Sequence, residues 1–172
     1  MKLRSLHDLY VSNLKDLYSA ESQIVKALPK MIKNASAPDL QDALQMHLDE
    51  TREHVNRLQR IFEEMDSSPG RKKCKGMEGL IEESQEMIGE LAEPEVMDAG
   101  IIAAAQKVEH YEISGYGTAR AYARLLNFEQ AADLLGQTLE EETRADAKLT
   151  EIAVSEVNRQ ASNGEREAMQ AR

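Results

Sequence analysis

The chain has 172 residues, a formal net charge of -10, 41% hydrophobic residues and 30% charged residues. This length fits one domain with a real core, and the strong helix formers that dominate the composition predict an all-α fold. The acidic charge disfavours a nucleic-acid partner, since such binding depends on Lys and Arg neutralising phosphates, and the single cysteine excludes both an internal disulfide and any site built from several cysteines.

The N-terminal residues, Met1 to Leu6, lead directly into an amphipathic pattern. They lack the apolar stretch and the small-residue cleavage site of a secretory signal. No apolar run along the chain reaches the roughly 20 residues that a membrane-spanning helix needs. We therefore expect a cytoplasmic protein that does not associate with membranes.

The first half of the chain predicts a hairpin of two long helices. Ser5 and Asp8 are spaced as in a capping box at the start of a first helix over residues 5–32. A short turn precedes a second helix over residues 38–65, with Pro38 in its first turn. Because the turn is short, the two helices should pack as antiparallel neighbours.

The second half predicts a long connection and another hairpin. The breaker Ser68-Pro69-Gly70 opens the connection, in which apolar spacing predicts one short helix over residues 77–88. Cys74 lies in this connection between basic neighbours, which can lower the pKa of a thiol. Two further long helices are predicted over residues 96–126 and 129–157.

Two helical hairpins joined by a long connection are the arrangement of a ferritin-like bundle. We therefore predict one ferritin-like four-helix bundle over residues 1–159, with a short fifth helix in its crossover connection. Residues 160–172 should form a polar C-terminal tail. A plain up-and-down bundle would not need so long a connection.

Each predicted long helix carries charged residues inside its apolar stripe. In the first helix, Glu21 falls between Leu17 and Ile24 on the apolar face. A carboxylate buried alone costs several kcal/mol unless it is paired, protonated or bound to a cation. For one helix, a glutamate that reaches solvent from the edge of the stripe remains an equally good interpretation.

The other three long helices repeat this feature. Their apolar stripes are interrupted by pairs three or four positions apart: Glu50 and His54, Glu109 and Glu112, Glu142 and Asp146. Residues at this spacing share a helix face and can converge on one ion. Carboxylates that meet in one core repel each other, and a pair of metal cations removes this conflict. These six residues and Glu21 are the predicted metal ligands.

An internal similarity indicates that each hairpin supplies half of the site. Glu50-Thr51-Arg52 matches Glu142-Thr143-Arg144 further along the chain. When the spacing between these two segments is added to the position of Glu21, the result falls next to Glu112. We therefore take Glu112 as the counterpart of Glu21 and Glu109, one turn earlier, as an additional ligand. The sequence leaves open which of the two is the main ligand.

Several segments resemble the YciE/YciF-type family of ferritin-like stress proteins. They are Asp16 to Glu21, Glu50 to His54, Glu109 to Gly117 and Glu140 to Asp146, and the likeness extends up to about Val157. The resemblance implies a ferritin-like fold, a di-iron site similar to that of rubrerythrins, and a dimer. It implies no defined activity.

Two departures from the ferritin pattern affect the expected site. The usual ligand pair is Glu-x-x-His, but Thr51 stands three positions before His54, so Glu50 must serve from four positions before. Asp146 stands where the last helix would carry a histidine. His47, two turns before His54, fits a core or supporting residue better than a ligand.

Three functions fit this pattern. The first is a di-metal oxidoreductase in which two iron ions, or manganese or another divalent metal, react with oxygen or peroxide. The second is a metal-binding or storage protein without turnover, and the third is a non-catalytic helical stress protein. A complete rubrerythrin-type peroxidase is disfavoured, because the chain lacks the cysteines of a rubredoxin-type iron site. We expect a homodimer or a larger homo-oligomer.

Overall fold

The computed structural model describes residues 3–163, which form helices and connecting loops without any strand. The long helices are α1 (Leu6–Asn34), α2 (Pro38–Glu64), α4 (Pro94–Leu125) and α5 (Glu129–Ile152), and the shorter α3 (Lys75–Gly89) lies between α2 and α4. The predicted all-α fold is confirmed. Among the described residues, no helix combines the length and the apolar character needed to cross a membrane.

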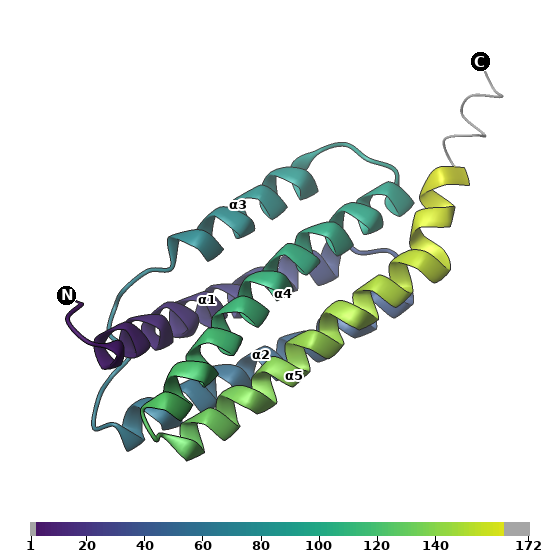
Figure 1. Cartoon of the computed structure of the whole chain (residues 1–172). Coiled ribbons are helices and arrows are strands. Elements are labelled where there is room, and N and C mark those ends of the chain that lie inside the picture. Colours follow the sequence, from purple (N-terminus) through teal and green to yellow (C-terminus); the bar gives the residue numbers. More distant parts are fainter. Residues whose placement is uncertain (1–2, 164–172) are drawn as a thin grey trace.

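The four long helices form an antiparallel bundle (Figure 1). α1 packs against α2 and α4, and α5 packs against the same two helices. The connection through α3 runs back along the bundle, so that α4 starts at the same end as α2 (Figure 1). α3 packs on the outside against α1 and α4. This crossover between two hairpins is the connection that the sequence predicts.

The helix ends follow local signals in the sequence. Ser5 forms the predicted capping box: its hydroxyl accepts a hydrogen bond from the Asp8 amide, and the Asp8 carboxylate accepts one from the Ser5 amide, both at 3.1 Å. Pro38 and Pro94 begin α2 and α4, where a backbone amide proton is not needed. Asn127 closes the turn between α4 and α5 with a φ of 60°.

The last helix differs from its prediction. The sequence predicts one α-helix to Val157, whereas α5 ends at Ile152 and a π-helix, Ala153–Val157, follows. Ala153 and Val157 are both buried, so the apolar spacing alone does not reveal the wider turn. Of the predicted C-terminal tail, residues 160–163 are helical, and residues 164–172 lie outside the described residues.

A buried polar layer divides the core of the bundle into two apolar clusters. One cluster contains Leu14, Leu58 and Leu135, and the other contains Ile24 and Leu149. Between these clusters the described residues bury four glutamates and two histidines. The layer lies midway along the bundle, because these residues come from the middle of the long helices.

Asp98 in α4 caps the start of α2 from a distant part of the chain. The N-cap residue of α2 is Ala37, which has no capping side chain. The buried Asp98 carboxylate accepts hydrogen bonds from the Ser36 amide at 2.7 Å, the Ser36 hydroxyl at 2.6 Å and the Ala37 amide at 2.9 Å. Its negative charge also suits the positive end of the helix dipole.

Replacing Asp98 by Ala should destabilise the protein by about 2 kcal/mol, because the cap is lost and amide groups remain buried without partners. Asp39→Ala is the matched control, since Asp39 is an exposed carboxylate in the first turn of the same helix. The control should cost about 0.5 kcal/mol. Urea unfolding measures both values, and equal losses would show that charge, not hydrogen bonding, stabilises this helix end.

Candidate metal centre

Side chains from all four long helices meet in the buried polar layer. They are Glu21 from α1, His47 and His54 from α2, Glu109 and Glu112 from α4, and Glu142 from α5. Each is at most 6% exposed. They form two groups of potential metal ligands, and within each group one donor atom per residue lies within 4.8 Å of the others.

Glu142 belongs to both groups. The first group is His47, Glu109, Glu112 and Glu142, and the second is Glu21, His54 and Glu142. The two oxygens of Glu142 face different histidines, since Oε1 lies 2.9 Å from His54 Nδ1 and Oε2 lies 3.9 Å from His47 Nδ1. Glu142 is therefore positioned to bridge the two groups.

Each group also contains a close contact between a glutamate and a histidine. Glu109 Oε1 lies 3.3 Å from His47 Nε2, and Glu21 Oε1 lies 3.4 Å from His54 Nδ1. The buried Tyr116 hydroxyl donates a hydrogen bond to Glu21 Oε1. This bond orients Glu21, whose other oxygen has no hydrogen-bond partner among the described residues.

Unpartnered polar atoms are concentrated in this centre. Of the eleven buried side-chain nitrogen and oxygen atoms without a hydrogen-bond partner in residues 3–163, nine belong to these six residues. Leaving such an atom unpartnered costs about 1–3 kcal/mol, and more when it is charged. Carboxylate oxygens and imidazole nitrogens that converge in this way are donors that suit iron and manganese.

Burial and mutual repulsion raise the pKa values of the two α4 carboxylates. Burial raises the pKa of Glu109 well above its ordinary value, and the nearby charge of Glu142 raises it further. Burial also raises the pKa of Glu112, and the charges of Glu21 and Glu142 add to this effect. In the metal-free protein these two groups hold protons at pH values where exposed glutamates are ionised.

His54 and Glu142 favour their charged forms. Burial alone would lower the pKa of His54, but the adjacent carboxylates of Glu142 and Glu21 raise it to about 11. Burial alone would raise the pKa of Glu142, but the nearby imidazoles of His54 and His47 lower it. Both shifts favour an ion pair between His54 and Glu142 in the metal-free protein.

Glu141 supports His54 from outside the two groups. His54 Nε2 lies 2.9 Å from Glu141 Oε2. Arg57 donates hydrogen bonds to the Glu141 carboxylate from both terminal guanidinium nitrogens, and its Nη2 lies 3.0 Å from Oε1. Arg57 also donates to the Thr138 hydroxyl at 3.2 Å. Because Nε2 is engaged in this way, His54 presents Nδ1 to the centre.

Exchanging Glu141 for Gln should weaken metal binding about 10- to 100-fold, because the carboxylate that orients His54 and favours its protonated Nε2 is lost. Glu140→Gln is the matched control, since Glu140 is the exposed neighbour on the same helix. A competition titration against a chelator gives both affinities. An affinity that is unchanged in Glu141→Gln would show that this contact does not support the centre.

The structure brings together five of the seven residues that the sequence predicts as ligands: Glu21, His54, Glu109, Glu112 and Glu142. Glu50 and Asp146 lie outside both groups. Glu50 is half-buried and lines a pocket next to the centre. Asp146 is half-buried and faces α4, where it accepts a hydrogen bond from Gln106 at 3.0 Å and lies 3.4 Å from His110.

In the donor set, α2 contributes His47 where the sequence predicts Glu50. Each residue advances an α-helix by about 100°, so His47 and His54 lie within about 20° of each other, whereas Glu50 lies about 40° to 60° from them. Thr51 lies between the two histidines, fully buried, and donates to the His47 carbonyl at 2.7 Å. The signal for His47 in the sequence is its two-turn spacing from His54.

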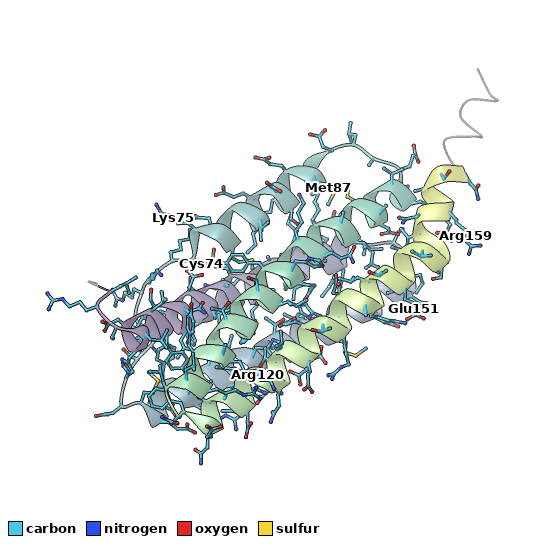
Figure 2. All side chains as sticks on the ribbon, viewed as in Figure 1. Cys74, Lys75, Met87, Arg120, Glu151 and Arg159 are labelled. Atoms are coloured by element: carbon cyan, nitrogen blue, oxygen red, sulfur yellow. The ribbon has the colours of Figure 1, made fainter. Side chains whose placement is uncertain are left out.

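Cys74 lies away from the centre, where the connection enters α3 (Figure 2). Its thiol lies 2.9 Å from the Tyr111 hydroxyl and 3.1 Å from Asp16 Oδ2. Burial raises the pKa of the Cys74 thiol, so the basic neighbours do not make this thiol acidic. Cys74 belongs to neither group of donors.

Comparisons with known proteins agree with this architecture. A family model described as a domain of unknown function, DUF892, matches residues 5–162. Protein YciF from Escherichia coli is 44% identical over 164 residues, which cover 95% of this chain and 99% of that protein.

Solved structures share the arrangement of helices. The crystal structure of the E. coli stress protein YciF matches with a TM-score of 0.87 and 44% identity over 91% of this chain and 99% of that chain. YcfI from Rhodopseudomonas palustris matches with a TM-score of 0.84 and 42% identity over 87% and 95% of the two chains. A protein from Xanthomonas campestris is only 19% identical but has a TM-score of 0.74 over 95% and 99%, so the fold persists at low identity.

Proposed function

The chain belongs to the DUF892 family, and we propose that it binds two metal ions, with iron as the physiological metal, in the core of its bundle. The observation that carries this proposal is the pair of donor groups that share Glu142. A relative in E. coli is described as a stress protein, and we propose a role in the stress response for this chain too.

The composition of the donor set supports a two-metal centre. Di-metal carboxylate bundles use four carboxylates and two histidines, which is also the set of residues buried here. The distribution differs, because α2 supplies both histidines and α4 supplies two of the glutamates. The four carboxylates carry one negative charge each when ionised, and two divalent cations would neutralise them.

When bound, iron supplies redox chemistry with oxygen or peroxide, and we propose that this is the reaction of the centre. The surrounding residues of the chain prepare the ligands for it. Glu141 and Arg57 orient His54, and Tyr116 holds one oxygen of Glu21. Glu109 and Glu112 hold protons in the metal-free protein and release them when a cation binds.

Peroxide consumption by the iron-loaded protein tests the proposed reaction. We expect a rate at least about tenfold above that of the metal-free protein, because the chemistry depends on the bound metal. Protein with Glu112 replaced by Gln, treated with iron in the same way, should match the metal-free rate. A wild-type rate no higher than the metal-free rate would leave metal binding or storage without turnover as the function.

We also propose that the chain forms a homodimer or a larger homo-oligomer, since most soluble oligomers are homo-oligomers and two-fold dimers are the commonest of them. The outer side of α4 supports this proposal. Leu125 is 71% exposed, and a side chain added at Gly117 would meet no atom within 4 Å among the described residues. Sedimentation at micromolar concentration should show a dimer or larger species, and a monomer would contradict the proposal.

A further inference from the structure

A pocket of about 450 Å³ opens between α2 and α5 and reaches the candidate metal centre. Half of its lining residues are apolar, such as Leu44 and Met46 from α2 and Ala145 from α5, and they form most of its surface. Met46 is 60% exposed and lies on the open side. His47 and Glu109, two of the candidate ligands, form its inner end. The pocket therefore leads from an open, largely apolar groove to one of the two donor groups.

The inner end of the pocket is polar and unpartnered. His47 is 6% exposed and Glu109 is 1% exposed. Both imidazole nitrogens of His47 and Oε2 of Glu109 have no hydrogen-bond partner within the part of the chain that the structure describes. A molecule in the pocket would thus meet apolar walls along its length and polar groups at its buried end.

The rim of the pocket carries charges of both signs. Glu50 and Glu151 are acidic, Arg144 and Lys148 are basic, and Glu151 lies on the outer part of α5 (Figure 2). Lys148 Nζ lies 3.0 Å from Glu151 Oε2. Because the charges balance, the rim attracts neither cations nor anions selectively.

The volume and the lining exclude the simplest uses of the pocket. A water molecule takes up about 30 Å³ of liquid volume, so oxygen or peroxide would leave most of the space unfilled. A route for metal cations would be lined by carboxylates along its length, whereas this lining places Arg144 and Lys148 among its carboxylates and is apolar over most of its surface. Sites for small organic molecules have volumes of about 300–1,000 Å³ and mainly apolar walls.

We infer that this pocket binds a neutral, mainly apolar organic molecule, with its polar end towards His47 and Glu109. The inference rests on the proposed function in one respect, because it takes molecules of this class to be the substrates of the metal centre. Binding itself does not require metal, because apart from His47 and Glu109 the lining comes from α2 and α5 and contains no member of the two donor groups.

Methyl NMR of protein labelled at the methionine methyl groups tests the inference, since Met46 lines the pocket. The probes are 1-octanol, octanoate and octylammonium, which share one chain length and differ in charge. In the metal-free protein, 1-octanol should shift the Met46 methyl signal saturably. The two charged probes should bind at least about tenfold more weakly, because an ionised group loses hydration on entering an apolar pocket.

Ala145→Trp should weaken 1-octanol binding at least about tenfold, because the indole ring fills the pocket. Ala121→Trp, on the exposed side of α4, is the matched control and should bind like the wild type. If Ala145→Trp does not fold, Ala43→Met fills the pocket from the opposite wall.

Three results would overturn the inference. The first is the absence of saturable 1-octanol binding. The second is tighter binding of octylammonium than of 1-octanol, which would indicate a route for cations. The third is dissociation of an oligomer by Ala145→Trp, which would indicate a protein interface. The metal content of wild-type protein is measured separately. Protein that binds 1-octanol but no metal refutes the proposed function alone, whereas protein that binds metal but no 1-octanol refutes only this inference.

Discussion

Replacing Glu112 by Gln should abolish binding of the metal pair and leave the metal-free protein at least as stable as the wild type at pH 8. Glu112 is fully buried, and neither of its oxygens has a hydrogen-bond partner in residues 3–163. Burial and the charges of Glu21 and Glu142 raise its pKa, so ionising it at pH 8 destabilises the fold. Gln keeps the shape of the side chain and removes this charge.

Thermal unfolding and metal analysis measure both effects of Glu112→Gln. The melting temperature of the metal-free variant should equal or exceed that of the wild type, by up to about 2–4 °C for each kcal/mol of relieved repulsion. Glu95→Gln is the control, because Glu95 is exposed in the first turn of the same helix. It should leave metal binding unchanged and cost only about 0.5 kcal/mol of stability, through the helix dipole. A variant that still binds the metal pair, or that melts far below the metal-free wild type, would show that Glu112 has a structural role instead.

The metal-free protein should lose stability as the pH rises from about 5.5 to about 8. Glu109 and Glu112 have folded-state pKa values above their unfolded values, so the folded protein binds more protons in this range. His54 acts in the same direction: the stability from its pKa of about 11 is complete below the unfolded value and is lost as the pH rises. The lowered pKa values of Glu141 and Glu142 matter only at more acidic pH.

Bound metal should reverse this dependence, because metal ions compete with protons for the same oxygens and hold the ionised form. Melting temperatures measured with a chelator at pH 5.5 and pH 8 should therefore fall with pH, and those measured with saturating metal should rise. The double replacement of Glu109 and Glu112 by Gln should weaken the metal-free dependence, and the part that remains comes from His54. If the metal-free wild-type protein becomes more stable between pH 5.5 and pH 8, Glu109 and Glu112 do not hold protons as proposed.

The sequence predicts the fold well because its strongest signals are local. Ser5 marks a helix start by its capping box and Pro38 by its place in the first turn, and the structure has helices at these positions. The family resemblance is confirmed by the 44% identity to E. coli YciF over 95% of this chain, together with the DUF892 match over residues 5–162. The cap that Asp98 provides for α2 could not be predicted, because the two segments are adjacent only after the bundle has formed.

The sequence predicts the centre less completely because helical spacing defines a face only approximately. Residues at the middle of a stripe, such as Glu21 and Glu142, are brought together, whereas Glu50 and Asp146 lie about 40° or more to the side of it. His47 lies on the same stripe as His54, but one sequence alone does not distinguish a supporting histidine from a ligand at such a position, and the structure places it in a donor group. The contact between Glu141 and His54 joins two helices, and the sequence of neither helix alone predicts it.

The position and number of bound metal ions test the central claim most directly. Protein loaded with ferrous iron without oxygen, then freed of excess metal, should contain two ions per chain by elemental analysis. Anomalous diffraction at the iron edge should place both ions among the six side chains, one in each donor group and both next to Glu142. Protein that retains no iron, or ions that lie away from Glu142, would contradict the claim.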